Sequence, residues 1–338
     1  MVCSLRGRTQ VPKLYFDGNA ICNVRQHRHL GIILSHDMTW QKHIEDITIR
    51  ANKRLDVLSR LSHVLDRKSL TNLYISFIRP TLEYGDILYN GCTEYQSKNI
   101  ERVQKRAARI ITGGIRGTSA QVLYAELGWI SMKERRDFHC LCLLNNIING
   151  RASEYLKEQL PNPVGVRTTH NLRNSANISL MAARTSLFQR SFFPSTIKLW
   201  NNLDKSTRDI YKISEVKRKL LPKKYVNPRF SLGQRKLNII WSRIRLGCSS
   251  LNAQLYVMNI VNDPTCACGY NYEDANLFFF TCPLYNRKRQ ALTEAFSRFN
   301  IHLDLHVILH GSDDLNDHDN KIIIQCVLDY IQDSNRFA

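Results

Sequence analysis

Apolar and basic positions along residues 98–114 recur with the period of an amphipathic helix. At about 100° per residue, one face of this helix is apolar and the opposite face is basic. The apolar face consists of Ile100, Val103, Ala107, Ile110 and Ile111. The basic face consists of Lys98, Arg102, Lys105, Arg106 and Arg109. Like charges four residues apart destabilise an isolated helix by about 0.2–0.5 kcal/mol per pair, so the pattern favours a negatively charged partner. The alternative is a solvated face on an ordinary bundle helix.

The same periodicity predicts helices on either side of this stretch. From Thr39 to Leu58 apolar residues recur every three or four positions, which predicts a long helix. A second helix is expected from an N-cap at Asp66 to Pro80, because proline cannot continue a helix.

Two more helices follow from local signals. Ser131 and Glu134 have the spacing of a capping box, which opens a helix that ends near Gly150. A terminal helix is expected over residues 320–333. Four helices are therefore predicted between residues 39 and 150, and one at the end of the chain.

Short strands are predicted only before residue 39. Asp17-Gly18 suits the positive φ angles of a tight hairpin turn, and residues 29–34 are expected to form one short strand. The predicted fold class is mainly α, with an N-terminal β-hairpin, a helical bundle and a helical C-terminal region. A loop containing Pro161, Pro163 and Gly165 marks a boundary. The predicted segments are 1–38 (strands), 39–159 (helical domain), 160–248 (basic connector) and 249–338 (C-terminal region with clustered cysteines).

Charge is distributed unevenly over these segments. The net charge is +19, and the acidic residues outnumber the basic ones in residues 249–338. Binding to a polyanion is therefore expected of the first 248 residues. We see no secretory signal and no stretch approaching eighteen apolar residues, so no membrane partner is expected. Ten cysteines without a secretory route indicate a reducing, intracellular compartment, nuclear or cytoplasmic.

Three of the cysteines have a spacing that suggests metal binding. Cys266 and Cys268 are one residue apart, and Cys282 lies fourteen residues further on. Three thiolates can hold zinc, but a closed structural site needs four protein ligands. The nearest downstream histidine is His302, twenty residues beyond Cys282. Free or buried thiols are an equally good interpretation.

The sequence offers no catalytic constellation. Two-metal nucleotide polymerisation requires clustered carboxylates, and no Asp-Asp pair follows a strand in the first 150 residues. In Tyr15-Phe16-Asp17-Gly18, glycine occupies the position of a second carboxylate. Asp313-Asp314 lies in a polar loop. We therefore predict no catalytic residues, no catalytic magnesium site and no small-molecule substrate.

Several stretches resemble a known family. HRHLGIILSHDMTWQKHI, LYISFIRPTLEYGDILYN, IERVQKRAARIITG and LGWISMKERR resemble the region after the active site in reverse transcriptases of Jockey-like non-LTR retrotransposons. SFFPSTIKLWNNL and CACG…EDANLFFFTCPLYNRKR resemble the later C-terminal part of the same reading frames. The resemblance implies that residues 1–38 are the last strands of the palm and residues 39–159 a thumb-like helical domain.

The resemblance also bears on function. In the family the fingers, most of the palm and the Tyr-x-Asp-Asp motif lie upstream of these blocks, so a truncated, catalytically inactive reverse transcriptase is expected. The family's C-terminal zinc knuckle would use Cys266, Cys268 and Cys282, but Leu277 stands at the position of its histidine. The expected activity is at most sequence-independent binding of RNA or an RNA–DNA hybrid. The alternative is a structural or interaction protein, or a non-functional fragment, without nucleic-acid binding.

Overall fold

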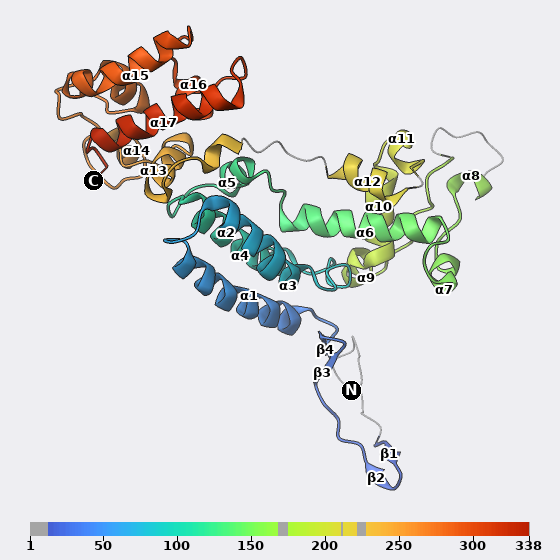
Figure 1. Ribbon diagram of the computed structural model, residues 1–338. Helices are drawn as coiled ribbons and strands as arrows, with labels where there is room; N and C mark the ends of the chain where they lie inside the picture. The colour runs from blue at the N-terminus through green and yellow to red at the C-terminus, as the bar shows by residue number, and fades with distance from the viewer. Residues whose placement is uncertain (1–12, 168–174, 211, 222–227, 338) are drawn as a thin grey trace. The chain divides into compact units, whose positions relative to one another are not determined.

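The computed structural model describes residues 13–167, 175–210, 212–221 and 228–337 (Figure 1). This part of the chain is mainly helical, with two short antiparallel hairpins near the N-terminus, which confirms the predicted fold class. Contacts divide the chain into two compact units. Unit 1 comprises residues 1–54, 77–104 and 130–223. Unit 2 comprises residues 55–76, 105–129 and 224–338. The segment boundaries at 38, 159 and 248 stay a prediction.

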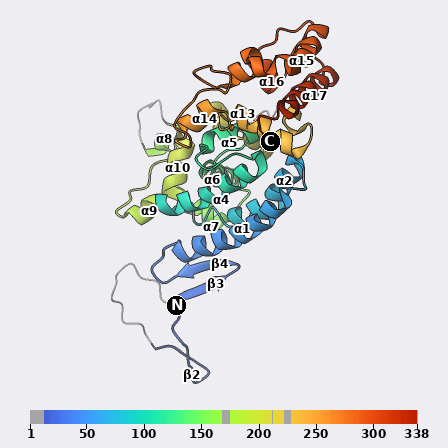
Figure 2. The same ribbon diagram turned by 90° about the vertical axis from the view of Figure 1, so that its left-hand side faces the viewer.

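In each hairpin, the residues of the turn have positive φ angles. In the first, β1 (Tyr15–Phe16) pairs with β2 (Asn19–Ala20), and the intervening Asp17 and Gly18 have φ angles of 47° and 73°. This confirms the tight turn predicted from the Asp-Gly dipeptide. In the second, β3 (Gln26–His29) pairs with β4 (Ile32–Ser35), and Figure 2 shows the two strands side by side.

The prediction of one strand over residues 29–34 is wrong. Leu30 and Gly31 have φ angles of 45° and 82° and form the turn between β3 and β4. The Leu-Gly pair lies within an otherwise apolar run, so the run concealed a reversal of the chain.

The long helices follow the apolar pattern closely. The helix α1 (Gln41–Leu61) buries Ile44, Ala51 and Leu55 almost completely. Asp66 caps α2 (Arg67–Leu73), because its carboxylate accepts a hydrogen bond of 2.7 Å from the N–H of Ser69.

Pro80 does not stop the helix, contrary to the prediction. A π-helical segment (Tyr74–Ile78) leads from α2 into α3 (Arg79–Glu83), and Pro80 lies in the first turn of α3. A proline is tolerated in a first turn, because the N–H it lacks would have no intrahelical partner there. The wider π turn lets the chain start a new helix without leaving the helical path.

Beyond α3 the chain forms α4 (Glu94–Thr112), α5 (Ala120–Leu127) and α6 (Met132–Ile148). The capping box at the start of α6 is confirmed, since the side chains of Ser131 and Glu134 each accept from the other's backbone N–H. The pattern analysis missed α5. Ser119 caps its N-terminus, and Gly128 ends it in the left-handed conformation.

In unit 1, α6 packs against α10 around a small apolar core. Leu144, Ile197 and Trp200 are buried there. One of the short helices of this region, α8, lies in the segment where a loop containing Pro161, Pro163 and Gly165 was predicted. These helices are α7 (Glu154–Glu158), α8 (Val164–Arg167), α9 (Ser186–Arg190), α10 (Phe192–Asn201), α11 (Lys205–Arg208) and α12 (Ile213–Leu220).

The core of unit 2 is larger and centres on Trp241, Phe278 and Phe279, which are almost fully buried. The indole N–H of Trp241 donates to the carbonyl of Ile308 at 3.0 Å. The terminal helix begins at 317, three residues earlier than predicted, because Asn316 acts as its N-cap. The helices are α13 (Arg235–Arg245), α14 (Asn252–Val257), α15 (Asn286–Arg298), α16 (Leu305–His310) and α17 (Asp317–Asp333). Shorter turns are η2 (Pro228–Ser231), η3 (Leu277–Thr281) and η4 (Pro283–Tyr285).

A buried ion network joins three helices of unit 2. The Glu126 carboxylate lies 2.8 Å from both Arg67 Nη1 and Arg245 Nη2, and all three side chains are at most 7% exposed. Burial alone would raise the pKa of Glu126, but the two guanidinium groups outweigh it and hold this pKa below its usual value.

We expect Glu126→Gln to lower the free energy of unfolding by about 3–5 kcal/mol at pH 7, because it leaves two buried cations without a carboxylate. Since the folded-state pKa of Glu126 is depressed, its contribution is present above the unfolded-state pKa of about 4.3 and is lost as the pH falls through the folded-state value. The difference between the two proteins should therefore narrow below about pH 4. Urea unfolding of both proteins at several pH values tests this.

The exposed Glu94 provides the control, and Glu94→Gln should leave the urea midpoint nearly unchanged. An equally small effect of Glu126→Gln would show that the network adds nothing to stability.

Candidate nucleic-acid interface and metal centre

The helix α4 has the two faces that its sequence predicts. On the apolar face Ile100, Val103 and Ile111 are at most 2% exposed, whereas Ile110 is half-buried. The basic face lies opposite. The buried stripe fixes the rotation of the helix, so the basic side chains point away from the core.

Two of the basic residues already have acidic partners. Lys98 Nζ lies 2.6 Å from Glu94 Oε1, and Arg106 Nη2 lies 2.5 Å from Asp56 Oδ1. Exposed pairs of this kind contribute little to stability. They do reduce the positive charge that the face offers to a polyanion.

The other three basic residues lack such partners. Arg102 is exposed and donates to the neutral Asn99 side chain at 2.8 Å, while Lys105 and Arg109 are half-buried. None of the three makes an ion pair with any other residue that the structure describes. Seven residues of α-helix span about 10 Å, so the three cations form a short basic row on one helix.

The end of α4 is held by arginines that pattern reasoning missed. Arg235 donates to the carbonyl oxygens of Ile111 and Ile110 at 2.8 and 2.9 Å, and Arg243 donates to that of Gly113 at 2.8 Å. These carbonyls would otherwise lack partners at a helix C-terminus, where cations are favourable. A basic residue 120 or more positions away in sequence gives no local signal of such a role.

The three cysteines of the predicted knuckle come together. Their sulfur atoms all lie within 4.8 Å of one another, and those of Cys266 and Cys282 are 3.8 Å apart. A tight turn brings Cys266 and Cys268 together, with Gly269 at a φ of 92° and its N–H donating to the carbonyl of Cys266 at 2.9 Å. Cys282 follows the π-helical segment η3.

The cysteine cluster fits zinc in its sulfur geometry. Ligands at the usual Zn–S distance of about 2.3 Å in a tetrahedron lie about 3.8 Å apart, which is the separation of Cys266 and Cys282. Burial raises the pKa of the Cys266 thiol to about 12 and also raises that of Cys282. The expected histidine position holds the buried, apolar Leu277, which supplies no ligand.

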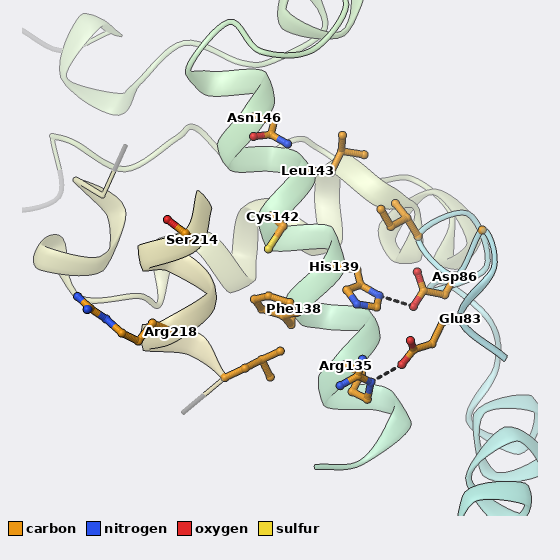
Figure 3. Close-up of a pocket in the computed structure, with 13 residues that line it drawn as sticks. Glu83, Asp86, Arg135, Phe138, His139, Cys142, Leu143, Asn146, Ser214 and Arg218 are labelled. Carbon is orange, nitrogen blue, oxygen red and sulfur yellow. Dashed lines mark hydrogen bonds and ion pairs between the residues drawn. The ribbon is translucent and has the colours of Figure 1, made fainter. Parts of the chain in front are cut away.

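Unit 1 also contains a cavity of about 1090 Å³ along α6 (Figure 3). Four of its polar groups form two ion pairs: His139 Nδ1 lies 2.6 Å from Asp86 Oδ2, and Arg135 pairs with Glu83. Burial raises the pKa of Asp86 above its usual value. In Figure 3, Cys142 projects from α6 and lines the same cavity as His139. The cavity therefore brings two ion pairs and a thiol to one helix of unit 1.

Searching the described helices for membrane spans finds none that is both long and apolar enough to cross a bilayer.

Comparison with known proteins gives one distant similarity. Over 115 residues the chain is 26% identical to a probable RNA-directed DNA polymerase from the transposon X-element of Drosophila melanogaster. The match covers 33% of this chain and spans 13% of the length of that polymerase. No family model and no solved structure matches the chain. The similarity supports a region related to a retrotransposon reverse transcriptase in about a third of the chain.

Proposed function

We propose that this chain is a catalytically inactive part of a Jockey-like non-LTR reverse transcriptase that binds RNA or an RNA–DNA hybrid without reading its sequence. The basic row Arg102, Lys105 and Arg109 on α4 carries the proposal. The distant similarity to a transposon polymerase supports it, because such an enzyme acts on RNA and DNA.

The row suits a phosphate backbone better than a base edge. Three cations along about 10 Å of helix cover the span of roughly four successive phosphates of one strand, which are spaced by about 3.4 Å along a B-form duplex. Backbone contacts give affinity and salt dependence but carry no sequence information. Binding should therefore be non-specific.

An interaction protein without nucleic-acid binding is the competing function. The ion pairs Lys98–Glu94 and Arg106–Asp56 favour it, because they neutralise two of the five cations on this face. Matched variants separate the two functions. Any strongly basic protein has some salt-dependent affinity for a duplex, but only a row that contacts phosphates makes a larger contribution than the same charge elsewhere on the chain.

We expect the double variant Arg102→Gln, Arg109→Gln to bind an RNA–DNA hybrid more weakly than the wild type, by a similar factor for unrelated sequences. The slope of log affinity against log salt should fall by about one to two units, because each phosphate contact contributes roughly 0.9. Fluorescence anisotropy across a salt series measures both quantities.

The matched control is Arg287→Gln, Arg298→Gln, which removes two exposed arginines of α15 and the same net charge. This control should change affinity and slope much less. If the two double variants behave alike, total charge rather than the α4 row governs binding.

We also expect the purified chain to incorporate no nucleotides on a primed RNA template with magnesium or manganese. The reason is the lack of a paired-carboxylate motif in its first 150 residues. A complete reverse transcriptase under the same conditions is the positive control. Extension by this chain that a point substitution in it abolishes would disprove the inactivity.

A further inference from the structure

We propose that Glu273 is the fourth ligand of a zinc ion held by Cys266, Cys268 and Cys282. The Glu273 side chain is 3% exposed, and its Oε1 lies 3.9 Å from Cys266 Sγ. The three sulfur atoms lie within 4.8 Å of one another, and Glu273 lies just outside this group, next to Cys266. A carboxylate is a ligand that zinc accepts beside three thiolates. The proposal does not depend on nucleic-acid binding.

The distance from Glu273 to Cys266 suits a four-coordinate site. With Zn–O near 2.0–2.2 Å and Zn–S near 2.3 Å, a tetrahedral oxygen and sulfur lie about 3.5 Å apart. The observed 3.9 Å is within a few tenths of an ångström of this value. Cys266 and Glu273 can therefore share one metal ion, and movement of Glu273 Oε1 toward Cys268 and Cys282 would complete the tetrahedron.

Glu273 is held toward the cysteines from both its backbone and its side chain. Its N–H donates to the carbonyl of Pro264 at 2.8 Å, and its own carbonyl accepts from Ala253 at 3.1 Å. Its Oε1 accepts from Arg336 Nε at 2.7 Å, and its Oε2 accepts from the N–H of Asn252 at 2.8 Å. Such partners orient a metal ligand and tune its basicity.

Two guanidinium groups near the cluster, those of Arg289 and Arg336, provide a second reason to expect a negatively charged centre. Arg289 is buried, donates to the Cys282 carbonyl at 2.9 Å, and makes no ion pair with a described residue. A buried cation without a counter-ion is costly. Three thiolates, a carboxylate and Zn²⁺ carry a net charge of −2, and Arg289 and Arg336 would balance it.

This ligand set accounts for Leu277. Glu273 lies four residues before the position where the related knuckles place histidine. The polypeptide reaches the fourth coordination position from the turn after Cys268 rather than from η3. An apolar Leu277 then packs in the core without loss of a ligand.

The test is zinc affinity of the full chain under reducing conditions, measured by competition with a chromophoric chelator. The wild type should bind one zinc per chain. Glu273→Gln should weaken binding by more than about 100-fold, beyond the range of about 10- to 100-fold for loss of an orienting partner. Arg336→Gln breaks the same ion pair but keeps the carboxylate, and should cost about tenfold. The exposed Glu294→Gln should have no effect.

Glu273→His separates ligand loss from misfolding, because it also breaks the ion pair but restores a ligand. It should bind zinc far more tightly than Glu273→Gln, and X-ray absorption should show three sulfur ligands with one imidazole in place of one oxygen. Circular dichroism checks that each variant is folded.

Three results would overturn the proposal: no zinc on the reduced wild type, equal affinity of wild type and Glu273→Gln, or no imidazole on zinc in Glu273→His.

Discussion

The buried Glu126 carboxylate is the constraint around which unit 2 is built. It comes from α5 and binds Arg67 of α2 and Arg245 of α13, so three segments distant in sequence must meet at one point. The Arg245 guanidinium also lies 3.9 Å from the centroid of Phe230 and 4.1 Å from that of Trp241. Burying the charged Arg245 side chain in this way without its carboxylate partner would destabilise the folded state. The network therefore specifies which helices assemble, while the apolar core supplies most of the stability.

Placing α13 by this network also places the other arginines along it. Arg235 and Arg243 meet the carbonyl end of α4, where the helix dipole is negative. Burial lowers the pKa of Arg235 to about 10, which leaves it charged at neutral pH. These arginines satisfy the last carbonyl groups of α4, as a C-cap residue would, although they come from another helix. A net charge of +19 thus overstates what is available to an outside polyanion, because part of it satisfies the interior.

Local signals predicted the fold better than the site. The apolar period located α1 and α4, and the caps at Asp66 and Ser131 fixed two helix starts, since these signals depend on neighbours within four residues. The Leu30-Gly31 turn and the continuation past Pro80 were missed, because φ angles and a π turn are set by packing rather than by residue type alone. The helix α5 was missed although Ser119 and Gly128 frame it. Its buried Glu126 resembles a surface residue in the sequence.

The same limit applies to the candidate sites. Spacing found the three cysteines, but Glu273 is an ordinary acidic residue in sequence and becomes distinctive only when its burial and its distance to Cys266 are known. Likewise, a helical wheel placed five cations on one face of α4 but could not show that Lys98 and Arg106 already have acidic neighbours.

What separates structural from available cations in this chain is the partner of each guanidinium or ammonium group. Arg67 and Arg245 have a buried carboxylate, and Arg235 and Arg243 have helix-end carbonyls, so their charge is used inside the fold. Arg102 is exposed, Lys105 and Arg109 are half-buried, and none of these three makes an ion pair with a described residue, so their charge is not used inside the fold. Desolvating a cation without a counter-charge is expensive, whereas releasing counterions from a phosphate backbone is favourable. The buried arginines obtain their negatively charged or carbonyl partners from the protein itself. The row on α4 would obtain its negatively charged partners from the phosphates of a nucleic acid.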